Sequence, residues 1–122
     1  MTVIEPTEME MVAGTHRALG MLSGRWAVDV LYLLAAGRRR YSEVYYEVGE
    51  VSKKALTTTL RRLERDGLVA RHVTSHSPLR VEYSLTPLGW SLTEPLMTLY
   101  EWSAQHLEDE APSRPERHLM AA

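Results

Sequence analysis

The chain has 122 residues, of which 44% are hydrophobic, so it can form one domain with a packed core. It contains no cysteine, which excludes disulfide bonds, cysteine-ligated zinc and thiol chemistry. The formal net charge is −2, but ten of the 14 basic residues lie between positions 38 and 80, so a basic middle separates two acidic ends. Such a distribution can direct one face of an acidic protein towards a polyanion.

No apolar run in the sequence is long enough to span a membrane. The N-terminus also lacks the basic and apolar regions of a signal peptide. We therefore expect a cytoplasmic protein without membrane contact.

A flexible N-terminus, residues 1–6, is expected to lead into a first helix over residues 7–22. Thr7 and Glu10 have the spacing of a capping box, in which each side chain caps a backbone N–H of the other. The apolar residues of this helix predict that it docks on either the core of the domain or a second subunit.

The next helix is predicted over residues 25–36, with Ser23 as its N-terminal cap and Gly37 as its stop. It is apolar almost throughout, which is typical of a helix at the centre of a core. Trp26, near its start, is interpreted first as an anchor in that core.

A short helix and a tight turn precede the most basic segment of the chain. Residues 38–41 can form a short strand, and Ser42 is expected to cap a helix over residues 43–48. The turn at residues 49–51 contains a glycine, and a second helix with polar residues at its start follows. This order is that of a helix-turn-helix motif.

The second helix of this motif is predicted over residues 52–66. Leu56, Leu60 and Leu63 recur at i, i+4 and i+7, so they form one apolar stripe. A serine caps its start, a glycine ends it, and its other faces are basic and polar.

The start of this helix contradicts two local preferences. Lys53 and Lys54 occupy the end where the helix dipole favours anions, and residues 57–59 are three threonines, which are poor helix formers. Local rules are broken most often at functional sites, and free N–H groups, lysines and short hydroxyl side chains suit a polyanion. The competing interpretation is a solvated basic face, in which Glu64 pairs with a neighbouring arginine.

After Gly67 the apolar period changes from 3.6 to 2, which predicts a β-hairpin. Alternating residues cover 69–74 and 80–85, and the turn-rich residues 75–79 connect them. A hairpin immediately after a candidate recognition helix is the arrangement of a winged helix.

The C-terminal helix is predicted over residues 87–107, with Thr86 as its cap and a restart near Thr93 caused by Pro95. It carries more apolar side chains than so small a domain can bury, which predicts a partner surface. Residues 108–122 are expected to form a disordered tail that contains acidic residues and proline.

Several segments, weak one by one, form a specific pattern in their order along the chain. They are Leu22-Ser-Gly-Arg-Trp26, Gly37-Arg-Arg-Arg-Tyr-Ser-Glu-Val44, Val51-Ser-Lys-Lys-Ala-Leu56, Leu60-Arg-Arg-Leu-Glu-Arg-Asp-Gly-Leu68, Arg80-Val-Glu-Tyr-Ser-Leu-Thr-Pro-Leu-Gly89 and Glu101-Trp102. Over about residues 14–104 the chain resembles the HxlR-type family of winged helix-turn-helix bacterial transcription regulators.

The resemblance implies a mainly α fold with a small β-hairpin wing (α+β), a winged helix-turn-helix over residues 7–107 that works as a homodimer. The helices 7–22 and 87–107 would build the dimer interface. The recognition helix 52–66 would enter the major groove of double-stranded DNA, and the wing 75–80 would contact the flanking groove or backbone. Such proteins repress or activate nearby genes, and we expect a repressor.

The residues expected to bind DNA combine cations that position phosphates with short polar side chains near the bases. They are Ser52, Lys53, Lys54, Thr57, Thr58, Arg61 and Arg62 of the recognition helix, His76 and Arg80 of the wing, and Arg40 before the short helix. The alternative is a winged helix used for protein–protein contact without specific DNA binding, a class that should lack a charged recognition face.

One departure from the family concerns signal sensing. Many members sense oxidants or electrophiles through a cysteine near the start of the first family helix, where this chain has Gly14. The signal is therefore expected to be a noncovalent small-molecule effector, or none. The aromatic surface expected to bind it comprises Trp26, Trp90, Tyr100 and Trp102.

The sequence indicates neither an enzyme nor a metalloprotein. It has no glycine-rich phosphate loop, no cysteine nucleophile and no HExxH motif. His72 and His76 lie four residues apart on a predicted strand with no cysteine nearby, which gives poor convergence on a metal ion. No cofactor is expected.

Overall fold

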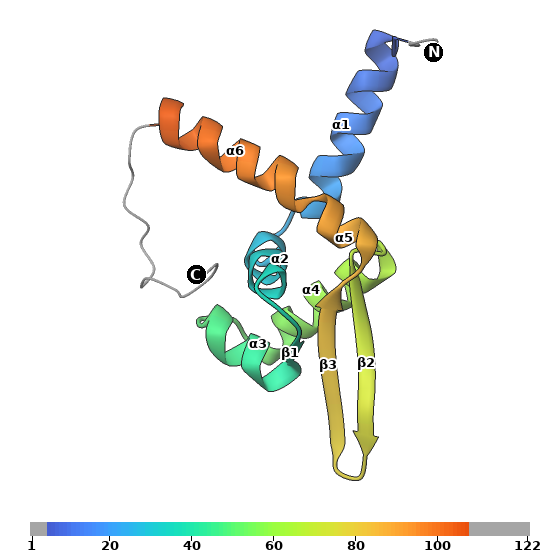
Figure 1. The fold of residues 1–122 in the computed structure, drawn as a ribbon, viewed down its shortest axis with the longest axis vertical. Coiled ribbons are helices and arrows are strands. Elements are labelled where there is room, and N and C mark those ends of the chain that lie inside the picture. The colour runs from blue at the N-terminus through green and yellow to red at the C-terminus, as the bar shows by residue number, and fades with distance from the viewer. Residues whose placement is uncertain (1–4, 108–122) are drawn as a thin grey trace.

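The computed structural model describes residues 5–107, so most of the expected flexible N-terminus and the whole expected tail, residues 108–122, lie outside the described residues. The described part contains six helices and three strands (Figure 1): α1 (Glu8–Leu22), α2 (Ala27–Ala35), β1 (Arg39–Arg40), α3 (Tyr41–Val48), α4 (Lys53–Arg65), β2 (Val69–His76), β3 (Leu79–Leu85), α5 (Pro87–Ser91) and α6 (Thr93–His106). The predicted α+β class is confirmed.

The core forms where α2, α3 and α4 meet. α2 is buried as its apolar sequence predicts, and the leucine stripe of α4 belongs to the same cluster. The largest side chains that are almost fully buried are Leu33, Leu34, Leu56, Leu60, Leu63, Leu68, Val30, Val44, Val48 and Val69. Each such side chain stabilises the fold by about 1.5–3 kcal/mol relative to an exposed one, so the outer face of α4 is carried by a well-anchored helix.

The small sheet has the strand order β1–β3–β2, and both neighbouring pairs are antiparallel. We call the β2–β3 hairpin the wing. Val69 faces Leu85 and Arg71 faces Tyr83 across it, which confirms the predicted alternation. The root of the wing adds Leu85 and Tyr83 to the core, whereas its far end extends away from the body (Figure 1).

Ser23 ends α1 and does not cap α2, contrary to the expectation. Its backbone N–H and its Oγ both donate to the Gly20 carbonyl oxygen, at 3.3 and 2.8 Å. Gly24 then adopts a positive φ of 97°, and α2 begins only at Ala27, without a side-chain cap. A serine between two helices can cap the end of the first helix or the start of the second. Here the hydrogen bonds show that Ser23 caps the end of α1.

Ser42 is also not a cap, because α3 begins one residue before it, at Tyr41. The Glu43 carboxylate accepts a hydrogen bond from the Arg40 backbone N–H at 2.8 Å and so caps the helix from inside. A carboxylate in the first turn is also favoured by the helix dipole.

The turn of the wing is tighter than the predicted connection over residues 75–79. β2 continues to His76 and β3 begins at Leu79, so only Ser77 and Pro78 lie between the strands. The strands remain paired beyond the apolar residues, through polar residues at the end of β2. The alternation of apolar residues in the sequence could not predict this extension.

The C-terminal segment forms two helices that meet at Leu92, as predicted from Pro95. Thr86 caps α5 by accepting from the Gly89 N–H at 3.0 Å. Its hydroxyl also donates to the Gly67 carbonyl oxygen, which ties the residue after the end of α4 to the start of the C-terminal helices.

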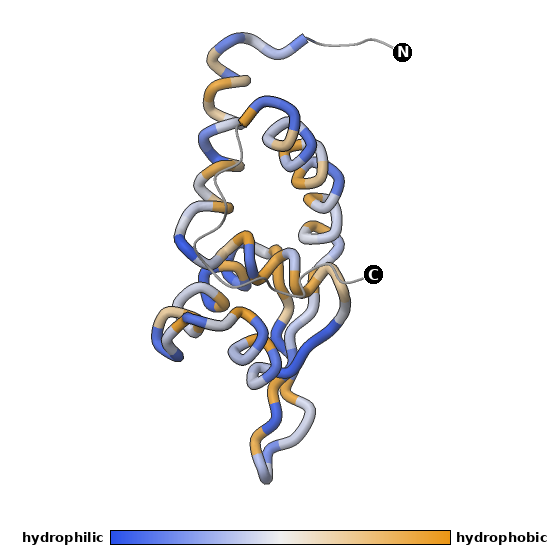
Figure 2. The backbone as a smooth tube through the Cα atoms, turned by 90° about the vertical axis from the view of Figure 1, so that its left-hand side faces the viewer, coloured by the Kyte–Doolittle hydropathy of each residue, from blue (hydrophilic) through white to orange (hydrophobic). Residues whose placement is uncertain are grey.

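α1 and α6 project from the body and diverge (Figure 1), and Figure 2 shows hydrophobic residues spaced along both helices. α1 has no buried residue, and α6 buries only Leu96. The large apolar side chains that they expose are Met9, Met11, Val12, Leu19, Met97, Leu99, Tyr100 and Trp102. Residues 5–107 of one copy leave these apolar side chains uncovered.

None of the helices within the described range is by itself long and apolar enough to cross a membrane. α1 and α2 reach the required length and composition only as a pair, and they meet at 80°.

Gly89 is required where α5 passes the connection between α4 and β2. A Cβ at this position would lie 2.2 Å from the Leu68 backbone oxygen, which cannot yield as a flexible side chain would. We expect Gly89→Ala to lower the free energy of unfolding by about 1–3 kcal/mol, measured by urea denaturation. Gly14→Ala is the matched control, because nothing lies within 4 Å of its Cβ position. It should raise stability by about 0.5–1 kcal/mol through helix propensity. Equal stability of the two variants would contradict this packing.

Candidate nucleic-acid interface

α4 exposes a continuous polar face opposite its leucine stripe. Ser52 Oγ accepts a hydrogen bond from the Ala55 N–H at 3.0 Å, which confirms the predicted cap. The first turn contains no acidic residue, so α4 itself does not neutralise the partial positive charge of its N-terminus. The exposed side chains on this helix and its cap are Ser52, Lys53, Lys54, Thr58, Arg61, Glu64 and Arg65.

Tyr41 links the start of α3 to the first turns of α4. Its hydroxyl lies 3.1 Å from Thr57 Oγ1 and donates to the Lys53 carbonyl oxygen at 3.3 Å. Thr57 is half-buried, whereas Thr58 is exposed. Lys53 Nζ lies 5.6 Å from the centroid of the Tyr45 ring, within the range of a cation–π contact. α3 therefore fixes the position of the basic first turn.

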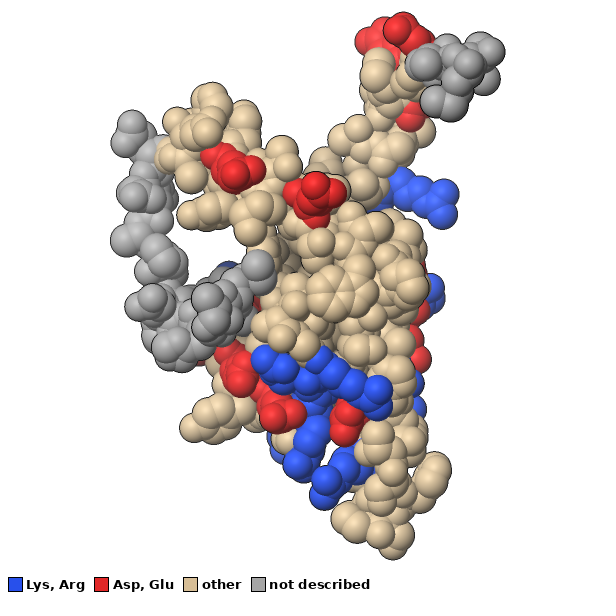
Figure 3. All heavy atoms as spheres, viewed as in Figure 1, with Lys and Arg blue, Asp and Glu red and all other residues tan. Residues whose placement is uncertain are grey.

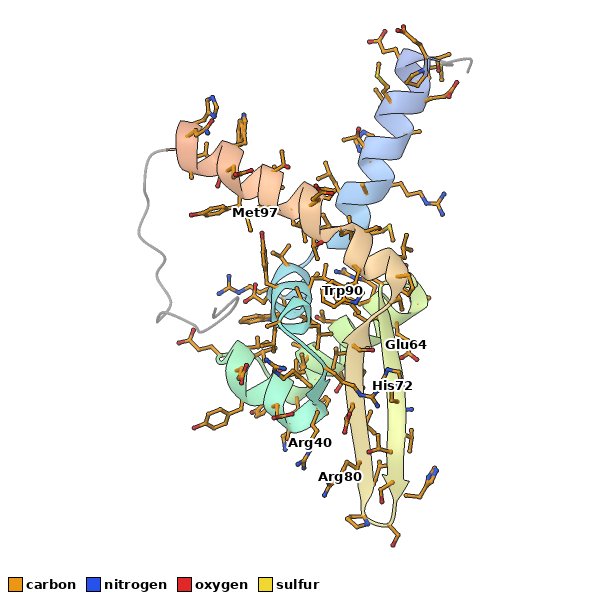
Figure 4. The ribbon with its side chains drawn as sticks, in the orientation of Figure 1. Arg40, Glu64, His72, Arg80, Trp90 and Met97 are labelled. Atoms are coloured by element: carbon orange, nitrogen blue, oxygen red, sulfur yellow. The ribbon has the colours of Figure 1, made fainter. Side chains whose placement is uncertain are left out.

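A hollow of about 630 Å³ lies between α4, the start of α3 and the wing. We call it the basic hollow, because its lining includes four arginines and one acidic residue. It is lined by Arg40, Tyr41, Ser42, Thr57, Arg61, Glu64, Arg71, Leu79, Arg80, Val81 and Tyr83. Figure 3 shows Lys and Arg side chains gathered over this part of the molecule, and Figure 4 shows Arg40 and Arg80 extending from β1 and β3.

Arg71 lines the basic hollow, although it is not among the residues that the sequence predicts to bind DNA. It lies on β2 opposite Tyr83 of β3. Burial raises the pKa of Tyr83, and Arg71 opposes that rise. The alternation of β2 already places Arg71 on the same face as Val69, but only the pairing with β3 shows that this face borders the basic hollow.

Arg62 does not line the basic hollow, although it is expected to bind DNA. Its guanidinium donates to the Ser23 carbonyl oxygen beside Gly24. Its Nε is buried and has no hydrogen-bond partner among the described residues. Arg62 therefore joins α4 to the segment from which α1 projects, and we leave it out of the candidate interface.

The other residues that are expected to bind DNA lie on the wing and on β1. His76 is exposed beside the turn of the wing, and Arg80 is exposed on β3. Of the three consecutive arginines before α3, Arg38 forms an ion pair with Glu82 at 2.5 Å, whereas Arg40 is exposed and lines the basic hollow.

The four aromatic residues expected to bind an effector do not share one pocket. Trp90 lines a pocket of about 320 Å³ between α2, α5 and α6. Trp102 lines a different, open hollow and stacks on His106, with ring centroids 5.3 Å apart. Trp26 packs against the core as predicted, and Tyr100 is exposed on α6. The helical positions alone could not show that Trp90 and Trp102 line different hollows.

A metal centre has no support in residues 5–107, where no three His, Cys, Asp or Glu side chains come together in a way that could hold an ion. His72 instead lies with Nε2 2.8 Å from Ser84 Oγ on the neighbouring strand.

Comparison with known proteins gives a consistent result. The family model described as HxlR-like helix-turn-helix matches residues 21–111. The HTH-type transcriptional regulator YtfH of Escherichia coli is 36% identical over 103 residues, which cover 84% of this chain and 82% of YtfH. The HTH-type regulator YkvN of Bacillus subtilis is 40% identical over 90 residues, covering 74% of this chain and 76% of YkvN. The reduced form of the transcriptional regulator YodB from B. subtilis superposes with a TM-score of 0.73 at 28% identity, covering 80% of this chain and 96% of YodB.

The adjacent residues Arg61 and Arg62 are expected to differ in their effect on stability. Arg62→Ala removes the hydrogen bond to the Ser23 carbonyl oxygen and should lower the free energy of unfolding by about 1–3 kcal/mol. Arg61→Ala changes an exposed side chain and should alter it by less than about 0.5 kcal/mol. Urea denaturation of both variants measures this difference. A loss of stability confined to Arg61→Ala would show that the two roles are wrongly assigned.

Proposed function

Because this chain belongs to the HxlR-like helix-turn-helix family, it is a DNA-binding transcriptional regulator and not an enzyme, and we propose that it represses its target genes as a homodimer on a double-stranded operator. The observation that carries the proposal is the basic hollow between the exposed face of α4 and the wing.

α4 fits the major groove of DNA in this proposal. The major groove is about 12 Å wide and admits one helix, and the wing leaves the outer face of α4 exposed. Lys53 and Lys54 contact phosphates near the helix N-terminus, where the dipole also favours anions. Ser52 and Thr58 are the short exposed side chains that reach base edges. Thr57 is hydrogen-bonded to the Tyr41 hydroxyl, and its role is to hold α4 in position.

The basic hollow receives the phosphate backbone that borders the groove. Arg40, Arg61, Arg71 and Arg80 approach it from β1, α4, β2 and β3, so one DNA strand can be held from several elements at once. Glu64 limits the excess of positive charge. The far end of the wing, with exposed His76, then reaches the flanking minor groove.

A homodimer accounts for the exposed apolar side chains of α1 and α6. Contiguous apolar surface of this kind marks an interaction site more often than a solvated face. Two copies joined through these helices would present two α4 helices to one face of DNA, with half-sites about 34 Å apart. A thiol switch cannot operate because the chain has no cysteine, so any signal that relieves repression is a noncovalent ligand.

The test is the salt dependence of DNA binding, measured by fluorescence anisotropy for the wild type and two arginine variants. Each phosphate contact contributes about 0.9 to the slope of log K against log salt. Arg61→Ala should therefore weaken binding and reduce the slope by about one unit. Arg25→Ala, an exposed arginine between α1 and α2 that does not line the basic hollow, is the control and should leave both quantities unchanged.

Three results are distinguishable in this experiment. A reduced slope for Arg61→Ala alone supports the proposed interface. Equal slopes for all three proteins would remove the basic hollow from the DNA contact. Absence of binding by the wild type at low salt would favour the alternative of a winged helix that contacts another protein.

A further inference from the structure

A second pocket lies where α6 leaves the body, apart from the basic hollow. We call it the α6 pocket. It has a volume of about 320 Å³ and is lined by Leu31, Tyr32, Ala35, Leu85, Gly89, Trp90, Thr93, Glu94, Leu96 and Met97. These residues come from α2, the end of β3, α5 and α6, and Figure 4 shows Trp90 and Met97 at this junction. Pockets of this size with mostly apolar walls are typical of small-molecule sites.

The hydroxyl groups of the α6 pocket are already used within the protein. Tyr32 donates to the Leu96 carbonyl oxygen at 3.3 Å, and Thr93 donates to the Trp90 carbonyl oxygen at 2.7 Å. They are therefore poor candidates for holding a polar ligand. The two aromatic rings, Tyr32 and Trp90, still present surface to the pocket.

Glu94 is the one charged side chain in the lining. Among the described residues it takes part in no ion pair. The excess of negative over positive charge extends beyond the pocket, because α5 and α6 contain two glutamates and neither lysine nor arginine. In Figure 3 the charged side chains over α6 are acidic. A ligand that enters the α6 pocket therefore meets one carboxylate and no lysine or arginine of these helices.

Apolar walls, aromatic faces and a single carboxylate are complementary to one class of small molecule. An organic cation with an aromatic body can place its ring against the apolar walls and its charge near Glu94. Cations are also attracted by the faces of tryptophan and tyrosine rings. An anion of the same shape would be repelled by Glu94 and would find no donor, because both hydroxyls are engaged.

We propose that the α6 pocket binds a small organic cation with an aromatic body, and that this cation is the noncovalent effector of the regulator. The effector role rests on the proposed function, but binding does not. The occupant contacts Leu31 and Ala35 of α2, the helix that packs against α4, and also Leu85 at the root of the wing. It therefore touches the elements that position both parts of the DNA interface.

The binding test uses two probes of the same shape and opposite charge, benzyltrimethylammonium and phenylmethanesulfonate. The full chain carries ¹³C-methyl methionine, and its methyl resonances are followed during each titration without DNA. We expect the Met97 resonance to shift saturably with the cation, while that of Met9 on α1, 82% exposed, does not. The cation should bind at least ten-fold more tightly than the anion.

Glu94→Gln and Glu101→Gln form a matched pair on α6, since both replace an exposed glutamate and only Glu94 lines the pocket. Glu94→Gln should weaken cation binding at least three-fold and narrow the preference for the cation, whereas Glu101→Gln should do neither. Equal binding of the two probes, or an unchanged preference in Glu94→Gln, would overturn the proposal. A Met97 shift that follows protein concentration and not the cation would also overturn it, because a second copy would then cover the pocket.

The effector role is tested by anisotropy with labelled operator DNA. Saturating benzyltrimethylammonium should change the DNA affinity of the wild type at least three-fold and leave that of Glu94→Gln nearly unchanged. Cation binding without this change would overturn the effector role. If the protein bound no DNA at all, the proposed function would fail, while the Met97 titration would still decide whether the pocket binds the cation.

Discussion

The packing of the α4 leucine stripe into the core is the contact on which the proposed DNA-binding surface depends. Leu56, Leu60 and Leu63 are each at most 1% exposed, and they fix the rotation of α4 about its axis. That rotation turns the lysines and Arg61 outward and leaves Arg62 beside the connection between α1 and α2. A helix that has no acidic residue in its first turn and three threonines in its second is not favoured by local preference. Tertiary burial therefore stabilises a helix whose outer face is basic and polar.

The basic hollow follows from the same constraint. α4 supplies one wall, and the wing supplies the other because the root of the wing is held in the core by Tyr83 and Leu85. Like charges that converge in this way repel one another in the free protein, and a bound phosphate backbone would relieve that repulsion. Arg62 does not line the basic hollow. Its guanidinium joins α4 to the end of α1 through the Ser23 carbonyl oxygen.

Much of the fold could be predicted from the sequence, because the apolar period is a strong signal wherever a helix or strand has one buried face. The stripe of α4, the alternation of the wing and the restart of the C-terminal helix at Pro95 are examples. Helix starts were less predictable, since Ser23 can serve the helix before it or the helix after it, and Glu43 inside α3 takes the capping role expected of Ser42. The candidate site shows the same limit. Arg61 and Arg62 are equivalent in the sequence, yet one lines the basic hollow and the other reaches the Ser23 carbonyl oxygen. Arg71 joined the site through strand pairing, and the α6 pocket is lined by residues of α2, β3, α5 and α6 that are far apart in the sequence.

The most direct test of the central claim, that α4 reads a specific DNA sequence while the basic hollow holds the phosphate backbone, is a fluorescence-anisotropy titration at three salt concentrations. One duplex would come from the intergenic region beside the gene for this chain, and the other would have the same composition in scrambled order. The account predicts tighter binding to the first duplex and a steep loss of affinity with salt on both, because phosphate contacts are common to the two and base contacts are not. Binding to neither duplex even at low salt would contradict the account.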